Sequence, residues 1–296
     1  MKAVVFLFCC IVACCSSARG ASGLETYASL STAELMTIAE SGDIVAQYEM
    51  GVRFFNGTIV SRDYAESVRW HLRAAERGYA KAQCNLGACF DRGLGVSRDY
   101  GEAVRFYRMA AEQGDANAQF NLATNYANGE GVSGDIVEAD RLCLLSAENG
   151  LPEAQNNIGV RYDRGERVSQ DREEAVRWYR RAAEQGLAAA QYNIGNALCL
   201  GRGVPRDYEK AAAWYRLAAE QGDANAQHNL GDCYFFGTGV APNNEAAYRW
   251  LLLAAAAGNT QGAQILAKLE EALLPDAIDS ARKWASGWKP FHRQHP

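Results

Sequence analysis

Apolar and small residues recur along this chain at the three- and four-residue steps of an α-helix. Within residues 79–114, Ala82, Leu86, Gly87 and Phe90 fall on one helical face, and the glycines that follow allow the chain to reverse. A second run with an apolar face of the same period completes the segment. The pattern therefore predicts two helices that are joined by a tight turn.

This helix-turn-helix pattern returns every 36 residues without a slip. Each unit carries an Ala-Gln pair, and the glutamines are Gln47, Gln83, Gln119, Gln155, Gln191 and Gln227. A fixed period of this length is typical of arrays in which every unit buries its apolar faces against its neighbours. The sequence thus predicts an all-α solenoid of six repeats.

Acidic and small residues at fixed places indicate how the helices begin and pack. The second helix of a unit is expected to begin at an aspartate with a glutamate three residues later, as in Asp99 and Glu102, where carboxylates cap free backbone amides. A glycine inside the first helix costs about 1 kcal/mol relative to alanine, which close approach of a neighbouring helix would offset. These glycines are Gly51, Gly87, Gly159, Gly195 and Gly231. The aromatic residues expected between units are Trp70, Phe106, Trp178, Trp214 and Trp250.

The segment AAEQGDANAQ occurs twice, at residues 110–119 and 218–227. In the frame of the repeats it spans the end of one second helix and the start of the next first helix. Gly114 suits the left-handed residue after a helix, and Asp115 suits the cap of the following helix. The duplication is therefore interpreted as a structural joint and not as a catalytic loop.

The repeats resemble those of a known family. The pattern A-Q-x-N-L/I-G-x-x-x-x-x-G-x-G-V-x-x-D-x-x-x-A-x-x-W-Y-R-x-A-A-E-Q-G is similar to the Sel-one-like repeat, a relative of the tetratricopeptide repeat, over about residues 43–271. The resemblance implies a right-handed α-solenoid that acts as an adaptor in protein assembly, signalling, membrane-protein quality control, or bacterial envelope and host-interaction roles. Three positions depart from the pattern. Ile59 and Arg167 replace the second glycine of the turn, and Ala123 replaces the glycine of the first helix in repeat 3.

The array is expected to have a cap at each end. Residues 21–42 contain Ser31 and Glu34 at the spacing of a capping box, which predicts a short N-terminal helix. The six repeats are placed at residues 43–78, 79–114, 115–150, 151–186, 187–222 and 223–258. Residues 259–296 are expected to form a partial seventh repeat and a closing helix, and this tail also resembles the closing segment of bacterial members of the family.

Residues 1–20 have the layout of a secretory signal peptide, with Lys2, an apolar run and then small residues. The run is too short to cross a bilayer as a helix. Two processing routes fit. Cleavage after Ala18 or Gly20 would release a soluble protein, whereas Cys14 closes a lipobox-like motif and would become a lipidated N-terminus. We expect an exported protein, either periplasmic or an outer-membrane lipoprotein, or alternatively a secreted one.

Charge and residue spacing disfavour several function classes. Without residues 1–18 the chain loses one lysine and has 29 basic against 35 acidic residues, and its basic residues are scattered, so nucleic acid is not an expected partner. The histidines form no ligand pair on one element of the array, and no C-x-x-C is present, so neither a metal nor a cofactor is expected. Cys199 and Cys233 fall at similar levels of adjacent first helices, where one disulfide is conceivable.

The positions that vary between repeats are the expected binding surface, because the scaffold positions stay constant. In tetratricopeptide-like arrays the first helices line the concave face, and here the residues one, five and eight after the glutamine differ. The asparagine two after the glutamine either grips the backbone of a peptide or joins neighbouring helices by hydrogen bonds, and its strict recurrence favours the second role. The predicted partner-binding residues are Tyr48, Phe55, Asn85, Phe120, Asn121, Asn157, Tyr192, Asn193, His228 and Asn229.

These observations together predict a non-catalytic, monomeric adaptor of the bacterial envelope that binds a protein or peptide segment. Its contact with a membrane would be limited to a lipid on Cys14. Two alternatives stay open. Cysteine-rich relatives associated with β-lactam binding suggest a cell-wall-related enzyme, and a secreted factor that binds host proteins is the other. That cysteine-rich branch places a disulfide in each repeat, whereas the five cysteines beyond the signal do not recur in phase here.

Overall fold

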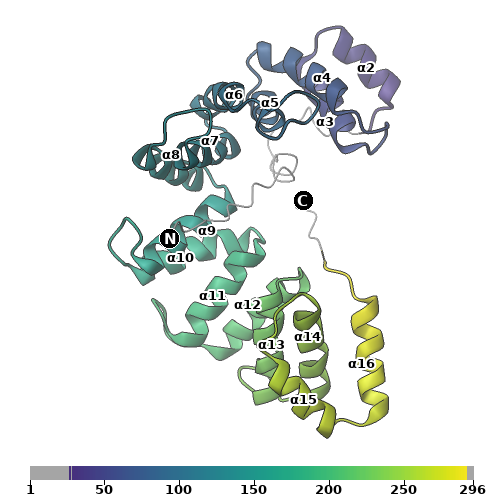
Figure 1. Cartoon of the computed structure of the whole chain (residues 1–296), viewed down its shortest axis with the longest axis vertical. Helices are drawn as coiled ribbons and strands as arrows, with labels where there is room; N and C mark the ends of the chain where they lie inside the picture. The colour runs from purple at the N-terminus through teal and green to yellow at the C-terminus, as the bar shows by residue number, and fades with distance from the viewer. Residues whose placement is uncertain (1–26, 28, 292–296) are drawn as a thin grey trace. The chain divides into compact units, whose positions relative to one another are not determined.

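The computed structural model describes residues 27 and 29–291, which form helices and turns with no β-strand among them (Figure 1). A short helix, α2 (Thr32–Glu40), comes first. The six repeats follow as the pairs α3 (Ile44–Asn56) and α4 (Tyr64–Glu76), α5 (Ala80–Arg92) and α6 (Tyr100–Glu112), α7 (Ala116–Asn128) and α8 (Ile136–Glu148), α9 (Pro152–Arg164) and α10 (Arg172–Glu184), α11 (Ala188–Leu200) and α12 (Tyr208–Glu220), α13 (Ala224–Phe236) and α14 (Asn244–Ala256). Two helices, α15 (Ala263–Ala272) and α16 (Pro275–Gly287), close the chain. The predicted all-α fold of helix-turn-helix repeats is confirmed, whereas the proposed signal peptide and Cys14 lie outside the described residues.

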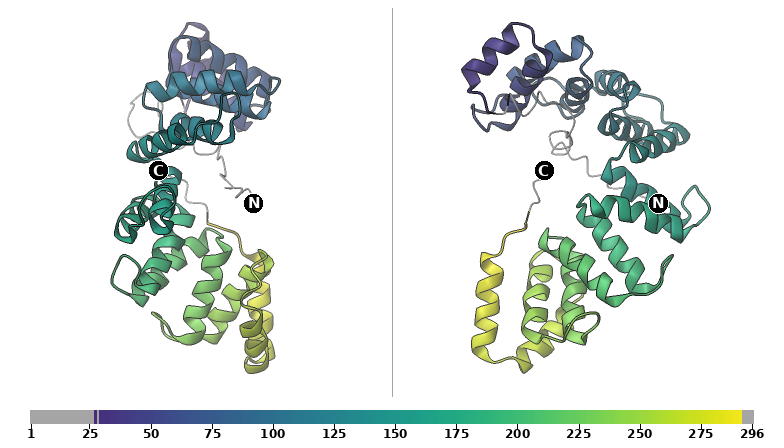
Figure 2. Two further views of the ribbon diagram at one scale, coloured as in Figure 1. Left: turned by 60° about the vertical axis from the view of Figure 1, so that its left-hand side comes forward. Right: turned by 180° about the vertical axis from the view of Figure 1, so that it is seen from behind.

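The described residues divide into two compact units, one ending at Ala154 and the other beginning at Gln155. Within a unit, the second helix of a repeat packs on its own first helix and on the first helix of the next repeat, as α6 does on α5 and α7. Additional helices cover the outermost repeats. In the first unit α2 packs on α3, and in the second α16 lies beside α14 (Figure 2). Terminal apolar faces are thereby removed from water, as solenoids require.

The helices begin at the predicted caps. Ser31 and Glu34 form the complete capping box of α2, in which each side chain bonds the backbone of the other. Asp99 accepts hydrogen bonds from the amides of the first turn of α6, and Asp115 does the same for α7. Such caps satisfy amides that have no partner within the helix, and each contributes about 1 kcal/mol. The structural interpretation of the duplicated joint is therefore confirmed at its cap.

The two glycines of the turn, Gly93 and Gly95 in repeat 2, are required for different reasons. Gly93 ends α5 in the left-handed conformation, with φ at 70°, which favours glycine. Gly95 also has a positive φ, of 73°, but a Cβ there would in addition overlap the backbone carbonyl of Tyr64 at the start of α4. Arg167, which replaces this second glycine in repeat 4, is the one described residue other than glycine with a positive φ, at 63°. The second glycine thus serves the packing of consecutive repeats as well as the turn.

The glycine inside each first helix makes room for an aromatic ring. A Cβ on Gly87 would lie 2.6 Å from the ring of Tyr107, which is the residue after the expected aromatic, Phe106. Repeat 3 departs at both positions, since Ala123 replaces the glycine and Cys143 stands where Tyr107 stands in repeat 2. Both residues are buried, at 5% and 3% exposed. Ala123 adds a methyl group to the core and Cys143 replaces a larger aromatic ring, so the two changes together keep the volume of the core similar.

Repeat 1 carries a histidine at the ring position. His71 is fully buried against Gly51, and its Nδ1 and Nε2 atoms each lie 3.3 Å from a polar atom, Ser67 Oγ and Asn85 Nδ2 respectively. Ser67 Oγ donates to the carbonyl of Gly51 at 2.8 Å, so it accepts from the imidazole, while the Asn85 amide donates to Nε2. This arrangement fits a neutral imidazole with its proton on Nδ1. Burial lowers the pKa of His71 to about 3.

The recurring glutamine ties each repeat to the preceding second helix. Gln83 Nε2 donates to the carbonyl of Ala75 at 3.1 Å, and Gln83 Oε1 accepts from Gln113 Nε2 at 2.7 Å. Gln113 belongs to the duplicated joint, and its counterpart Gln221 donates to Gln191 at 2.8 Å in the same way. Both glutamines of the joint therefore satisfy buried polar groups at the boundary between repeats, which is why this segment is repeated so closely.

The last repeat lacks one partner in this series of bonds. Gln227 Oε1 is buried with no hydrogen-bond partner among the described residues, because Ala257 stands where Gln113 stands in repeat 2. Ala257 and Gln113 share a φ of −86°, so a glutamine would be placed similarly. We expect Ala257→Gln to raise the free energy of unfolding by about 1 kcal/mol in urea titrations.

Gln113→Ala provides the matched control for this prediction. It removes the donor to Gln83 Oε1 and is expected to cost about 1–3 kcal/mol, because a buried acceptor is left unpaired. An Ala257→Gln variant no more stable than the wild type would show that Gln227 Oε1 is satisfied in another way.

Candidate binding site

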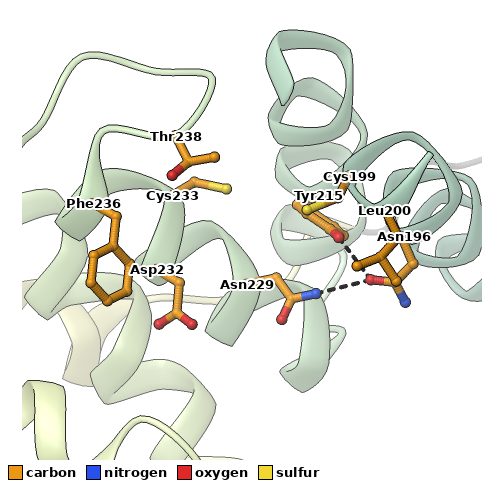
Figure 3. A pocket seen from close by; sticks show the side chains of 9 residues that line it. All are labelled: Asn196, Cys199, Leu200, Tyr215, Asn229, Asp232, Cys233, Phe236 and Thr238. Atoms are coloured by element: carbon orange, nitrogen blue, oxygen red, sulfur yellow. Dashed lines mark hydrogen bonds between the residues drawn. The ribbon is translucent and has the colours of Figure 1, made fainter. Parts of the chain in front are cut away.

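A pocket of about 250 Å³ lies between the first helices of repeats 5 and 6, within the second unit (Figure 3). Its walls come from α11, α12, α13 and the turn after α13. The lining residues are Asn196, Cys199, Leu200, Tyr215, Asn229, Asp232, Cys233, Phe236 and Thr238. The walls are mostly apolar and include a few polar groups, a combination that is typical of binding sites.

A hydrogen-bonded group holds the polar part of the pocket. The ring of Tyr215 lies over Gly195, where a Cβ would come within 2.7 Å, and its hydroxyl donates to Asn196 Oδ1 at 2.7 Å. Asn229 Nδ2 donates to the same oxygen at 3.1 Å (Figure 3). The side-chain oxygen of Asn229 and the amide nitrogen of Asn196 are the atoms that these two bonds leave for a ligand.

Large apolar side chains form the outer part of the pocket. Leu200 and Phe236 are 56% and 64% exposed, and each is the residue before the left-handed glycine that ends its helix. The other four repeats carry polar residues at that position, namely Asn56, Arg92, Asn128 and Arg164. Exposure of a large apolar side chain to water is unfavourable. Two such side chains at the same position of successive repeats, both beside a pocket, therefore indicate a contact surface.

One carboxylate supplies the charge of the pocket. Asp232 is the charged side chain among the described lining residues, and its Oδ2 atom lies 3.5 Å from Nε2 of His228. Its Oδ1 atom is enclosed and has no hydrogen-bond partner in the described part of the chain. Burial raises the pKa of Asp232, and the nearby imidazole opposes that rise. The pocket therefore contains one carboxylate, with one of its two oxygens enclosed and unpaired within the described residues.

The two cysteines of the pocket are free, so the conceivable disulfide between Cys199 and Cys233 is not formed in the structure. Burial first, and then the nearby Cys199 and Asp232, raise the pKa of the Cys233 thiol to about 12. A thiol with such a pKa stays protonated at neutral pH, and the thiol form is a poor nucleophile. Cys199 is partly exposed at the pocket wall.

The aromatic residues that were predicted to contact a partner differ in how exposed they are. Tyr48 and Phe120 are buried, at 4% and 6% exposed, and therefore present little surface to a partner. Phe55 is half-buried, with its ring 5.2 Å from that of Tyr64. Tyr192 is half-buried, and its ring centroid lies 6.2 Å from that of Tyr215.

The recurring asparagines join helices, as the structural interpretation predicts. Asn193 donates to Asn156 at 2.9 Å and Asn229 donates to Asn196 at 3.1 Å, and both bonds connect first helices of successive repeats. Asn85 instead bonds the buried imidazole of repeat 1. Asn121 and Asn157 are half-buried. A role of these side chains in gripping a peptide stays a prediction.

Sequence reasoning found only part of the pocket. Asn229 was predicted as a contact residue, Asn196, Cys199 and Asp232 occupy positions recognised as variable, and His228 lies at the edge beside Asp232. Leu200 and Phe236 were missed because they lie nine residues after Gln191 and Gln227, outside the positions that were taken as contact residues. The replacement of polar by apolar residues at this position was the signal that could have revealed them.

In residues 27 and 29–291, no group of three or more His, Cys, Asp and Glu side chains is arranged to hold a metal ion. None of the helices described is both long and apolar enough to cross a membrane.

Comparison with known proteins identifies related structures. A Sel1 repeat protein from Oxalobacter formigenes is 34% identical, covering 79% of this chain and 99% of that chain with a TM-score of 0.71. The protective antigen c5321 of uropathogenic Escherichia coli, which has an SLR fold, is 28% identical over 86% of this chain and 70% of that chain, with a TM-score of 0.42. The immunity protein PA5088 from Pseudomonas aeruginosa is 21% identical over 80% and 86%, with a TM-score of 0.49. No curated protein matches the chain.

A family model agrees with these repeats. The model described as Sel1 repeat matches residues 44–79, 80–115, 116–151, 152–187, 188–223 and 224–259. The matched segments have the same length and spacing as the helix pairs, and together they cover most of the chain. The chain therefore belongs to the Sel1 repeat family.

Proposed function

We propose that this protein is a non-catalytic scaffold of the bacterial envelope, and that it binds a segment of a partner protein on the surface formed by its first helices. Sel1 repeats typically form scaffolds for protein-protein interaction. The observation that carries the proposed binding face is the pocket between α11 and α13, with Leu200 and Phe236 exposed beside it. Export rests on the signal-like sequence of residues 1–20.

The chemistry of the pocket supports binding over catalysis. A hydrolase that used Cys233 would need a thiolate, and burial keeps the pKa of this thiol near 12. Tyr215 and Asn229 both donate hydrogen bonds to Asn196, and these bonds hold the pocket wall in place. A preformed wall with exposed apolar residues is suited to receive a side chain of a partner, in line with the general features of peptide-binding surfaces.

The proposal is tested by affinity capture from a bacterial envelope extract under gentle crosslinking. Wild-type protein is expected to retain a partner, and the double variant Leu200→Asn and Phe236→Asn is expected to lose it. Asparagine is the residue that repeats 1 and 3 carry at this position, so the change is tolerated elsewhere in the same fold. A second double variant, Arg92→Ala and Arg164→Ala, changes the same position in repeats 2 and 4 and should leave capture unchanged.

Alkylation of Cys199 reports on the same surface. Because this partly exposed thiol lines the pocket, iodoacetamide should modify it in the free protein and modify it at least about tenfold more slowly when the partner is bound, as measured by mass spectrometry of the peptide that contains it. Equal capture by wild type and the Leu200/Phe236 variant, with an unchanged rate at Cys199, would place binding elsewhere. Capture of nothing under crosslinking would contradict the scaffold function.

A further inference from the structure

The pocket between α11 and α13 has a chemistry that narrows what can enter it. We propose that it receives the side chain of an arginine in the partner segment, with the guanidinium group at Asp232 and the aliphatic stem along Leu200 and Phe236. This inference rests on the proposed scaffold function and specifies its partner. It follows from the charge of the pocket, the hydrogen-bond acceptors in it and the exposed aromatic ring.

The negative charge of the pocket favours a ligand with a positive charge. Asp232 is the charged side chain among the described lining residues, which include no lysine or arginine. Its side chain is 33% exposed, so a ligand can reach the carboxylate from outside. An anionic group, such as the terminal carboxylate of a peptide, would meet repulsion there. A purely apolar side chain would bury the carboxylate without a partner, which is costly.

The acceptors match the donors of a guanidinium group. Asp232 is a carboxylate acceptor whose side chain is 33% exposed, and Asn229 keeps its side-chain oxygen after its amide bonds Asn196. These two residues are three apart on α13 and therefore neighbours on one face of the helix (Figure 3). The hydroxyl of Thr238 is a further acceptor at the pocket. Several acceptors spread around one site fit the planar fork of five N–H groups in arginine better than the single point of charge in lysine.

The aromatic ring completes the site. Phe236 is 64% exposed, and Phe235 contacts it edge-on at 4.9 Å between ring centroids, with the two planes 81° apart. An exposed aromatic face attracts a guanidinium group, which is weakly hydrated and stacks well. The chain already uses this pairing internally, since the guanidinium of Arg181 lies 4.5 Å from the ring centroid of Trp178. Leu200, on the facing helix, offers the aliphatic stem an apolar wall.

His228 is a group of the protein itself that could compete with the arginine for Asp232. His228 Nε2 lies 3.5 Å from Asp232 Oδ2, and a protonated imidazole would occupy part of the carboxylate. All peptides and variants are therefore compared at one pH, pH 8.

A library of random 12-residue peptides displayed on phage is selected against the full immobilised chain at pH 8. Peptides with an arginine at one aligned position, flanked by apolar residues, are expected to be enriched. The best peptide, made synthetically, should bind at least about tenfold more weakly after its arginine is replaced by citrulline, which has nearly the same shape without the charge. The same loss is expected with Asp232→Asn.

Glu112→Gln is the matched control for Asp232→Asn. Glu112 is an exposed carboxylate at the end of α6, a second helix, so its removal changes the net charge of the protein equally while leaving the pocket and the first helices intact. It should leave the affinity unchanged, and circular dichroism should show that both variants keep the helical content and unfolding midpoint of the wild type. An equal loss with both variants would attribute the effect to overall charge and overturn the proposal.

The outcomes separate this inference from the scaffold function. Enriched peptides without a fixed arginine, with a fixed lysine instead, or with an affinity insensitive to Asp232→Asn would overturn the arginine site and leave the scaffold function standing. Enrichment of no peptide at all, together with an empty affinity capture, would overturn both.

Discussion

Acidification from pH 7 to pH 5 is expected to lower the free energy of unfolding by about 2 kcal/mol through His71 alone. The imidazole takes up a proton near pH 6.5 in the unfolded chain, whereas burial lowers its pKa to about 3 in the folded protein. Between these values the unfolded state binds more protons. The part of the free energy of unfolding that depends on a neutral His71 is therefore fully present above pH 6.5 and is lost as the pH falls towards 3.

The contribution is isolated by comparison with His71→Tyr. Tyrosine is the residue that repeats 2, 4 and 5 carry at this position, and it does not titrate in this range. Urea unfolding at pH 7 and pH 5 should show that the wild type loses about 2 kcal/mol more than the variant. Carboxyl groups whose pKa burial raises, such as Asp115, change stability in the opposite direction and do so in both proteins, so they cancel. An equal loss in the two proteins would show that the folded protein protonates His71.

Gly95→Ala is expected to have the second large effect, a loss of about 2–5 kcal/mol in the free energy of unfolding. Its φ of 73° is unfavourable for a residue with a side chain, which accounts for about 1–2 kcal/mol. The new methyl group would also overlap the carbonyl of Tyr64, where α4 begins, and backbone atoms cannot move aside as a flexible side chain can. Consecutive repeats would have to separate there.

Gly114→Ala separates these two causes. Gly114 has a positive φ of 88°, and a Cβ at this position meets nothing within 4 Å. It should therefore show the conformational cost alone, about 1–2 kcal/mol, and the excess loss of Gly95→Ala measures the packing between repeats. Similar losses for the two variants in urea unfolding would mean that α4 and the turn adjust without cost, contrary to the geometry.

Much of the fold could be read from the sequence because its signals are local and repeated. The cap at Asp99, the left-handed Gly93 and the apolar face of each helix depend on residues within a few positions of each other. Repetition of the same signal six times removed the ambiguity that a single helix leaves. The duplicated joint was interpreted correctly for the same reason.

Less of the candidate site could be read, because it depends on side chains that the chain brings together across two repeats. Asn229 was predicted to join helices, yet its partner Asn196 lies at a different position of the preceding repeat. Phe236 differs from the polar residues of four other repeats at its position, but only its exposure in the structure showed that it lies on the surface, since an apolar residue near a helix end is ordinarily buried. Tyr48 and Phe120 varied as contact residues would, but packing placed them inside.

The sequence by itself determined the repeat length, the helix boundaries and the family, because caps, turn glycines and helical periodicity act over short distances along the chain. Only the tertiary structure decided which ring lies over each helix glycine, that His71 is buried and neutral, and that Asp232, Asn229 and Phe236 meet at one pocket. These properties depend on burial and on the distance between side chains of different helices. Both are set by how the repeats pack and not by the order of residues within one repeat.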